Sequence, residues 1–170
     1  MPVLKGEDAS ALFRFFSAPE ISGPIYTIEK PVTLESCAAH IERKLSAQTR
    51  GEGLMCALFD EAGEIISYMD FTIWPNWSAA EFGGAMRSDR QSRGQGRSGM
   101  AESMDWVFGR LGVNLLCFTA ALDKHRSIHM IDASGMRRAG EVTSTSPDGS
   151  TRQSLVWEIT ADEWKQGRND

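Results

Sequence analysis

The chain has 170 residues, 41% of them hydrophobic, so we expect one folded domain over residues 1–170 rather than a disordered chain. Its 18 lysines and arginines against 23 aspartates and glutamates give a net charge of −5, which disfavours a nucleic-acid binder. The sequence shows no apolar run near the roughly 20 residues of a membrane span and no signal-peptide pattern, so we expect a cytoplasmic protein without a membrane partner.

The first third of the chain predicts two helices joined by an irregular connection. Residues 8–17 place Ala11, Leu12, Phe15 and Phe16 on one helical face. Residues 18–32 contain three prolines and a glycine and are expected to be irregular. Thr33 is a plausible N-cap for a second helix, because apolar residues then recur every four positions.

The middle of the chain predicts three strands. Residues 54–59 and 64–74 are apolar segments around a turn and should form a hairpin. The segment 74–77, with Pro75 between two tryptophans, interrupts the pattern before a third strand at 78–87. Gly83 and Gly84 lie inside this third strand, where glycine often marks a bulge or a close backbone approach.

The last third predicts helices alternating with strands. A helix is expected at 100–111, a strand buried on both sides at 113–122, a helix at 125–134, strands at 137–145 and 151–159, and a short closing helix. The element order predicts an α/β (α+β) fold around one mixed sheet. The unit at 78–122 should be a crossover that joins parallel strands.

The most informative segment is 90–99, where three arginines and three glycines stand between a strand and a helix. Glycine permits close backbone approach, a helix start offers unpaired N–H groups, and arginine binds phosphate oxygens in a bidentate manner. The segment therefore predicts a diphosphate site. The P-loop pattern fails because the segment has no lysine, whereas Gly94–Gly99 satisfies the dinucleotide string G-x-G-x-x-G. That second alternative is less favoured, because the string follows a hairpin in mid-chain.

The segment Arg93-Gly94-Gln95-Gly96-Arg97-Ser98 resembles the acyl-CoA motif [QR]-x-x-G-x-[GA] of the GNAT superfamily of N-acetyltransferases, with serine at the last position. The same motif is complete in a register that begins at Gln91. Downstream, Lys124 to Met136 resembles the N-x-x-S-x(7)-G-F element of the branch that includes ribosomal-protein N-terminal acetyltransferases. Here lysine replaces the asparagine and methionine the aromatic residue. The resemblance covers the predicted core, about 8–160.

The resemblance implies a GNAT-like, mostly antiparallel sheet flanked by helices, with a splayed strand pair that holds CoA. It implies acetyl-CoA as co-substrate, no metal, and direct transfer of acetyl to an amine. Glu81 would be the base, with Asp70 in reserve, and Ser127 would lie near the sulfur of CoA. The residues expected to bind the cofactor are Met86, Arg87, Ser88, Arg93, Gly94, Gln95, Gly96, Arg97, Ser98, Gly99 and Lys124.

Other interpretations stay open for several of these residues. Ser127 could simply cap its helix, Glu81 could be an exposed strand carboxylate, and Lys124 a solvated side chain. His125 and His129 lie one helical turn apart, but no third metal ligand is evident. Trp74 and Trp77 could wall an acceptor pocket or simply pack.

Two further questions are not decided by the sequence. The family position that often carries a tyrosine acid is Ile131, so a non-catalytic acyl-CoA sensor of the same fold is the alternative function. The acceptor, a small-molecule amine or a protein N-terminus, is open. So is the oligomeric state, with a homodimer as one option.

Overall fold

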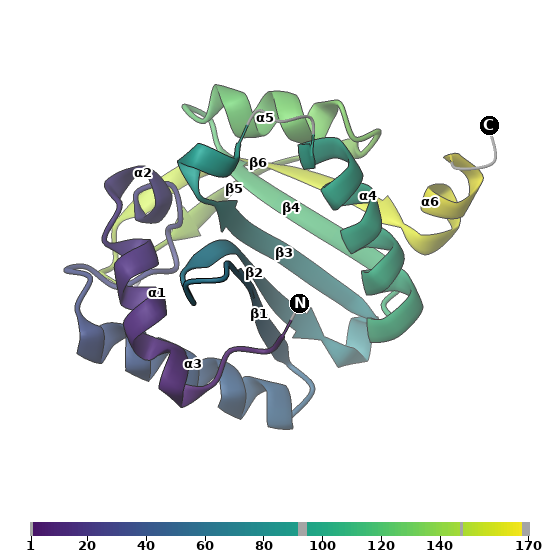
Figure 1. Cartoon of the computed structure of the whole chain (residues 1–170). Helices are drawn as coiled ribbons and strands as arrows, with labels where there is room; N and C mark the ends of the chain where they lie inside the picture. The colour runs from purple at the N-terminus through teal and green to yellow at the C-terminus, as the bar shows by residue number, and fades with distance from the viewer. Residues whose placement is uncertain (1, 92–94, 147, 168–170) are drawn as a thin grey trace.

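The computed structural model of the protein describes residues 2–91, 95–146 and 148–167, with the backbone alone for 95–100. A six-stranded sheet runs through the molecule in the order β1-β2-β3-β4-β6-β5 (Figure 1). Neighbouring strands are antiparallel except β3 and β4, which are parallel. The strands are β1 (Gly53–Phe59), β2 (Ile65–Trp74), β3 (Ala79–Met86), β4 (Leu115–Ala121), β5 (Arg137–Thr145) and β6 (Thr151–Thr160).

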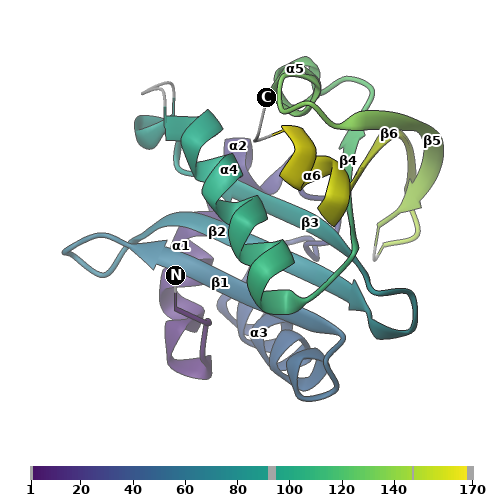
Figure 2. The ribbon, with the colours of Figure 1, turned by 90° about the vertical axis from the view of Figure 1, so that its right-hand side faces the viewer.

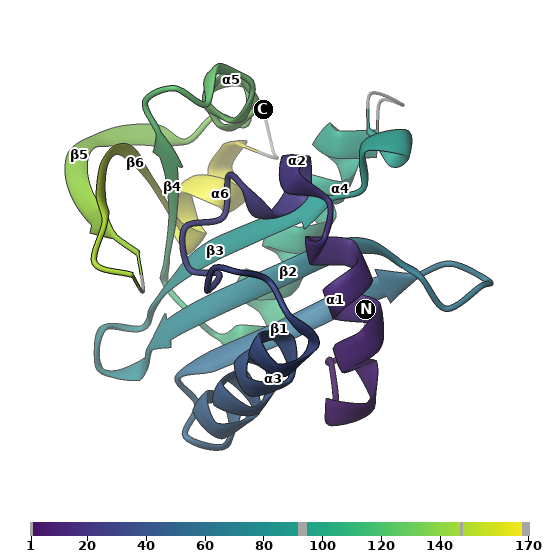
Figure 3. The same cartoon turned by 90° about the vertical axis from the view of Figure 1, so that its left-hand side faces the viewer.

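Helices cover both faces of the sheet. They are α1 (Ala9–Phe16), α2 (Pro19–Ser22), α3 (Leu34–Thr49), α4 (Gln95–Trp106), α5 (His125–Asp132) and α6 (Ala161–Gly167). The first three lie on one face (Figure 3), and α4, α5 and α6 lie on the other (Figure 2). The predicted fold class, a mixed sheet that is mostly antiparallel and flanked by helices, is confirmed. None of the helices in the described part of the chain has the length and hydropathy of a membrane span.

The face covered by α1–α3 is formed as the helical patterns predict. Leu12 and Phe16 of α1 are fully buried against the buried Tyr68 of β2. Thr33 caps α3, because its hydroxyl accepts from the Ser36 N–H at 3.0 Å, as expected. The prediction that residues 18–32 are irregular is partly wrong. Pro19 starts the short helix α2, since proline is tolerated in a first helical turn.

The hairpin of β1 and β2 also forms as predicted. The Asp60 carboxylate accepts from the N–H groups of Ala62 at 3.1 Å and Glu64 at 2.9 Å, which fixes the turn. The next strand, β3, pairs with β2 without a bulge. Its Gly84 marks a close approach instead, because a Cβ there would lie 2.6 Å from the Tyr68 carbonyl oxygen.

Helix α4 begins earlier than the sequence predicts. The apolar pattern starts at residue 100, but the helix starts at Gln95, so the second half of the glycine–arginine segment is helical. Five residues of π-helix, Val107–Leu111, follow α4 and end at Gly112 with a φ of 66°. The strand expected at 113–122 forms as β4, in which no side chain is exposed.

Candidate active site

The central feature of the sheet is a gap between β3 and β4. These two strands pair only through Ala79–Phe82 and Leu115–Phe118. Beyond the Phe82–Phe118 pair, β3 continues to Met86 and β4 to Ala121 without pairing to each other. We call this opening the fork. The predicted splayed strand pair is confirmed.

The edge of β3 that faces the fork offers backbone groups. The Arg87 N–H donates to the Ile66 oxygen of the preceding hairpin at 2.8 Å. In an antiparallel ladder the hydrogen-bonding direction alternates, so the N–H and C=O groups of Gly84 and Met86 point away from β2, towards the fork. The Met86 oxygen accepts from Gln91 Nε2 at 2.6 Å. Gly83 and Gly84 are both exposed, so an extended ligand could lie along this backbone.

Glu81 lies at the base of the fork on the face that carries α1–α3. It is directly opposite Cys117 of β4, one residue before the last β3–β4 pair. Its Oε1 accepts a hydrogen bond of 2.7 Å from the Thr119 hydroxyl, which comes from the first residue of β4 beyond the pairing. One carboxylate oxygen is therefore fixed by this bond. A half-buried, oriented carboxylate at this place can accept a proton.

Tyr26 and Arg152 flank Glu81, and sequence reasoning missed both. The Arg152 guanidinium lies 4.2 Å from the centroid of the Tyr26 ring and donates to the Pro24 oxygen at 2.9 Å. Burial, and secondarily the negative charge of Glu81, raises the pKa of the Tyr26 phenol. Tyr26 comes from the connection before α3, and no sequence pattern ties that connection to β6.

Asp70, the reserve candidate for the base, is engaged in a buried network. Its carboxylate lies 2.5 Å from Lys44 Nζ and accepts from the Tyr68 hydroxyl at 2.9 Å. His40 Nε2 lies 3.4 Å from that hydroxyl. Cys117 is beside Glu81, but burial raises the pKa of its thiol to about 11. Glu81 is therefore the better placed proton acceptor.

Ser127 and Lys124 lie at the start of α5, which packs against β4 at the same end of the sheet as the fork (Figure 1). Ser127 is half-buried in the first turn of the helix, and Lys124 is the N-cap residue. Lys124 Nζ lies 3.1 Å from the Asp123 carboxylate. Ile131 is buried in the core.

The predicted phosphate-binding residues lie at the start of α4. Gln95, Gly96, Arg97, Ser98 and Gly99 belong to its first turns, so their first N–H groups lack intrahelical partners. Arg93 and Gly94 lie outside the described residues, and of Arg97 and its neighbours only the backbone is described. The N-termini of α4 and α5 both lie at the open end of the fork (Figure 1).

Arg87 and Ser88 follow β3 directly. The Arg87 side chain is already bound to carboxylates, at 3.0 Å from Asp60 and 2.7 Å from Asp89. It therefore links the end of β3 to the hairpin turn, and its guanidinium is already held by two carboxylates. Ser88 is exposed in the short turn after the strand.

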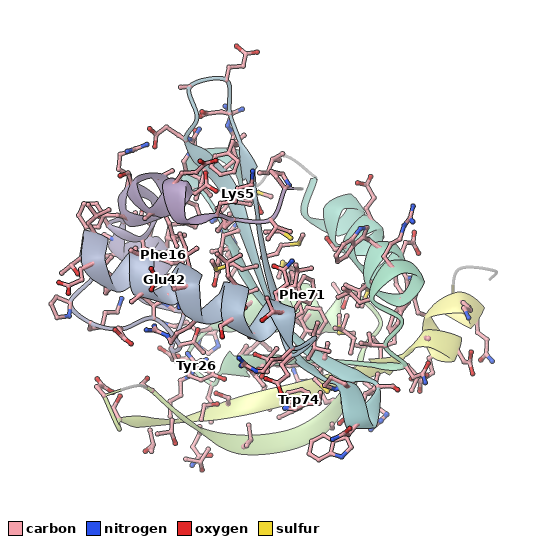
Figure 4. All side chains as sticks on the ribbon, turned by 90° about the horizontal axis from the view of Figure 1, so that it is seen from below. Lys5, Phe16, Tyr26, Glu42, Phe71 and Trp74 are labelled. Atoms are coloured by element: carbon pink, nitrogen blue, oxygen red, sulfur yellow. The ribbon has the colours of Figure 1, made fainter. Side chains whose placement is uncertain are left out.

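A pocket of about 720 Å³ opens on the α1–α3 face, and one of its lining residues, Thr72, is the cross-strand partner of Glu81. Trp74 and Trp77 both line it, and their role as walls of an acceptor pocket stays a prediction. Figure 4 shows Trp74 at the end of β2 and Tyr26 on the same side of the molecule. The pocket is lined by Thr27, Glu29, His40, Arg43, Lys44, Ala47, Glu52, Thr72, Ile73, Trp74, Pro75, Asn76 and Trp77.

Within the described ranges, no group of three or more histidine, cysteine or acidic side chains is arranged to hold a metal ion. His125 and His129 are both exposed on α5.

Comparisons with known proteins identify the family of the chain. The family model described as Acetyltransferase (GNAT) domain matches residues 2–137. No curated protein matches the chain.

Solved structures share the fold at low sequence identity. The ribosomal-protein-S5-alanine acetyltransferase from Vibrio fischeri is 16% identical, with a TM-score of 0.78 over 96% of this chain and 93% of that one. The spermidine N-acetyltransferase from Vibrio cholerae, in complex with CoA and spermine, is 14% identical, with a TM-score of 0.78 over 96% of each chain. A putative acetyltransferase from T. thermophilus is 21% identical, with a TM-score of 0.77 over 98% of this chain and 87% of that one.

Proposed function

The chain belongs to the GNAT acetyltransferase family, and from that premise we propose that it transfers acetyl from acetyl-CoA directly to a primary amine. The observation that carries the proposal is the fork with Glu81 at its base. Backbone groups of Gly84 and Met86 face the fork, and two helix N-termini lie at its open end. This arrangement suits an extended cofactor with an anionic head, because helix N-termini favour phosphate.

In this proposal acetyl-CoA supplies a thioester whose acetyl group is activated for transfer to nitrogen. The first N–H groups of α4 and the arginines around them would bind the diphosphate, and the β3 backbone near Met86 would bind the arm. Lys124 would add a positive charge near the phosphates.

Two side chains would move or share protons. Glu81 would take the proton that the amine loses as the amide bond forms, directly or through a water. Its Oε2 is the natural site, because Thr119 already donates to Oε1. The departing thiolate of CoA would accept a hydrogen bond from the Ser127 hydroxyl and take a proton from solvent, while Glu81 releases the proton of the amine to solvent, so the cofactor ends as a free thiol.

Incubation of the purified protein with acetyl-CoA and a panel of primary amines tests the proposal. Release of free thiol that depends on both substrates is the expected result, with the N-acetyl product identified by mass. No thiol release with any amine would contradict transfer. If calorimetry then showed tight CoA binding, the protein would be the acyl-CoA sensor, an alternative that the isoleucine at position 131 favours.

The acceptor is a small-molecule amine or a protein N-terminus in this proposal. The solved relatives named above act on spermidine in one case and on a ribosomal protein in another, so the fold serves both classes. A cytoplasmic location, a homodimer, and the lack of nucleic-acid and membrane partners stay predictions.

A further inference from the structure

A row of aromatic side chains crosses the sheet at the base of the fork. Phe82 of β3 is the direct partner of Phe71 on β2, and Phe118 of β4 is the direct partner of Trp157 on β6. Phe82 and Phe118 are themselves the last pair between β3 and β4. All four side chains belong to the core cluster that contains Met104 of α4, so the row lies on the α4 face of the sheet.

The rings of this row hold one another in place. The centroid of the Phe82 ring lies 5.1 Å from that of Phe71 and 5.0 Å from that of Phe118. Phe71 and Trp157 are fully buried, and Phe118 is 4% exposed. Phe82 therefore has a packed aromatic ring on each side, and its own ring cannot move far without disturbing the core.

The Phe82 ring also extends towards the open part of the fork. A Cβ on Gly84 would lie 3.6 Å from the Phe82 Cζ, so the tip of the ring lies beside the glycine two positions further along β3. Gly84 is exposed, and its backbone groups face the fork. On β4 the residue two positions beyond Phe118 is Ala120, whose side chain lies on the same face. On the α4 side, the fork thus has the Phe82 ring at its base and two small residues beyond it.

The two faces at the base of the fork differ in chemistry. The α1–α3 face has the Glu81 carboxylate and the Thr119 hydroxyl, joined at 2.7 Å, whereas the α4 face has the phenyl rings of Phe82 and Phe118. In the proposed reaction the amine loses its proton to Glu81, so it approaches from the polar face. The alkyl end of the acyl group is better buried against the rings than beside an ionised carboxylate.

We propose that Phe82 limits the length of the acyl group that the protein transfers, because its ring admits acetyl and excludes butyryl. This inference rests on the proposed function, and it names a specificity-determining residue of the same site. The neighbouring rings keep Phe82 from yielding to a longer chain, since an overfilled, well-packed core forces side chains out of their preferred rotamers. Each methylene that does not fit such an apolar site lowers kcat/KM by about 10- to 200-fold.

Acyl-CoA donors of increasing length test the inference. Acetyl-, propionyl- and butyryl-CoA are compared with one amine that the wild-type protein acetylates, and each donor gives the same free CoA thiol. We expect kcat/KM for acetyl-CoA to exceed that for butyryl-CoA at least about tenfold. Butyryl transfer as efficient as acetyl transfer would overturn the inference and leave acyl transfer itself intact.

Variants of Phe82 locate the effect. Phe82→Ala removes the ring and should bring kcat/KM for butyryl-CoA to within about threefold of that for acetyl-CoA. Phe82→Leu, which keeps a large apolar side chain in the core, should give an intermediate ratio. The ratio of two donors in one protein is compared, so a general loss of activity cancels. The wild-type ratio in both variants would overturn the inference.

Phe108→Ala is the matched control. Phe108 packs against the same core cluster, but it belongs to the π-helical segment Val107–Leu111 and not to β3 or β4. We expect this variant to keep the wild-type ratio between the two donors. A change as large as that in Phe82→Ala would overturn the inference, because loss of core packing alone would then relax the selectivity.

Calorimetry separates failure of this inference from failure of the proposed function. If the protein releases no thiol with any amine, the affinities for acetyl-CoA and butyryl-CoA are measured in the wild type and in Phe82→Ala. Tighter binding of acetyl-CoA that disappears in the variant would support the role of Phe82 and contradict the transferase. Equal affinities of the wild type for the two donors would overturn the role of Phe82 as well.

Discussion

Thr119 determines how Glu81 can act. Its hydroxyl donates to one carboxylate oxygen, Oε1, at 2.7 Å, so the second oxygen, Oε2, is the one that this bond does not occupy. The bond joins two strands at the point where their backbone pairing stops, so no ladder hydrogen bond holds Thr119 to β3. The side-chain bond therefore orients the carboxylate and also bridges the base of the fork.

Replacing Glu81 with glutamine tests the base. The amide keeps the shape and can still accept from Thr119, but it cannot take a proton. We expect kcat/KM to fall by about 10²–10⁴, the usual contribution of a general base. Affinity for acetyl-CoA, measured by calorimetry, should stay as in the wild type. Thiol release at the wild-type rate would exclude Glu81 as the base.

Replacing Thr119 with valine tests the orientation of that base. Valine keeps the volume and removes the donor, so the carboxylate loses the hydrogen bond that orients it. We expect kcat to fall roughly tenfold with little change in KM, because the base is misplaced while the binding groups are intact. Thr119→Ser should restore kcat. A valine variant with the wild-type kcat would show that the bond has only a structural role.

At the scale of elements, β3 carries two adjacent glycines with different roles. A Cβ on Gly84 would lie 2.6 Å from the backbone oxygen of Tyr68, whereas a Cβ on Gly83 meets nothing closer than 3.9 Å. Gly84→Ala should therefore lower the free energy of unfolding by about 1–3 kcal/mol, as overpacking does. Gly83→Ala should change it by less than about 0.5 kcal/mol. Urea unfolding of the two variants measures the contrast, and equal losses would refute the close approach.

The elements also show where sequence patterns suffice. Apolar segments between turn residues predict most of the strands, because each such segment is buried on at least one face. The segment 137–145 is different, since every residue of β5 except Ser144 is exposed, and it is predicted as a strand by its place before the turn at 146–149. Pro19 is a case where the pattern misleads. Proline usually predicts a break in helical structure, but here it is the first residue of α2. The apolar pattern places the start of α4 five residues late, because Gly96 and Gly99 are poor helix formers and tertiary packing overrides that propensity.

The candidate site was less predictable than the fold. Glu81 and Ser127 could be named from a family resemblance, and both lie near the fork. Thr119 could not be found, because its bond to Glu81 depends on the β3–β4 register between residues 38 positions apart. Tyr26 and Arg152 meet across an even longer separation. Such contacts are fixed by tertiary packing, which no local pattern reports.

At the scale of the whole molecule, a buried histidine predicts the response of stability to acid. Burial is the main cause that lowers the pKa of His40 below 6.5. The unfolded chain then binds a proton more readily than the folded one, so stability is lost as pH falls through and below 6.5. We expect the urea midpoint to decrease between pH 7.5 and 5.5.

Two variants test whether His40 causes this dependence of stability on pH. His40→Gln should flatten the dependence of the urea midpoint on pH, whatever it does to stability at pH 7.5. His129→Gln, at an exposed position on α5, should leave the dependence as in the wild type. The same slope in all three proteins would mean that His40 is not its source.

The short pairing between β3 and β4 also has a mechanical consequence. Four residues on each strand hold β1–β3 to β4–β6, whereas the other ladders extend over at least seven residues on each strand. Under a pulling force the sheet would part at this seam before it parts elsewhere. The opening that would receive the cofactor thus lies next to the weakest pairing of the sheet. A ligand that contacts both β3 and β4 would add interactions across this pairing and raise the force needed to separate the two strands.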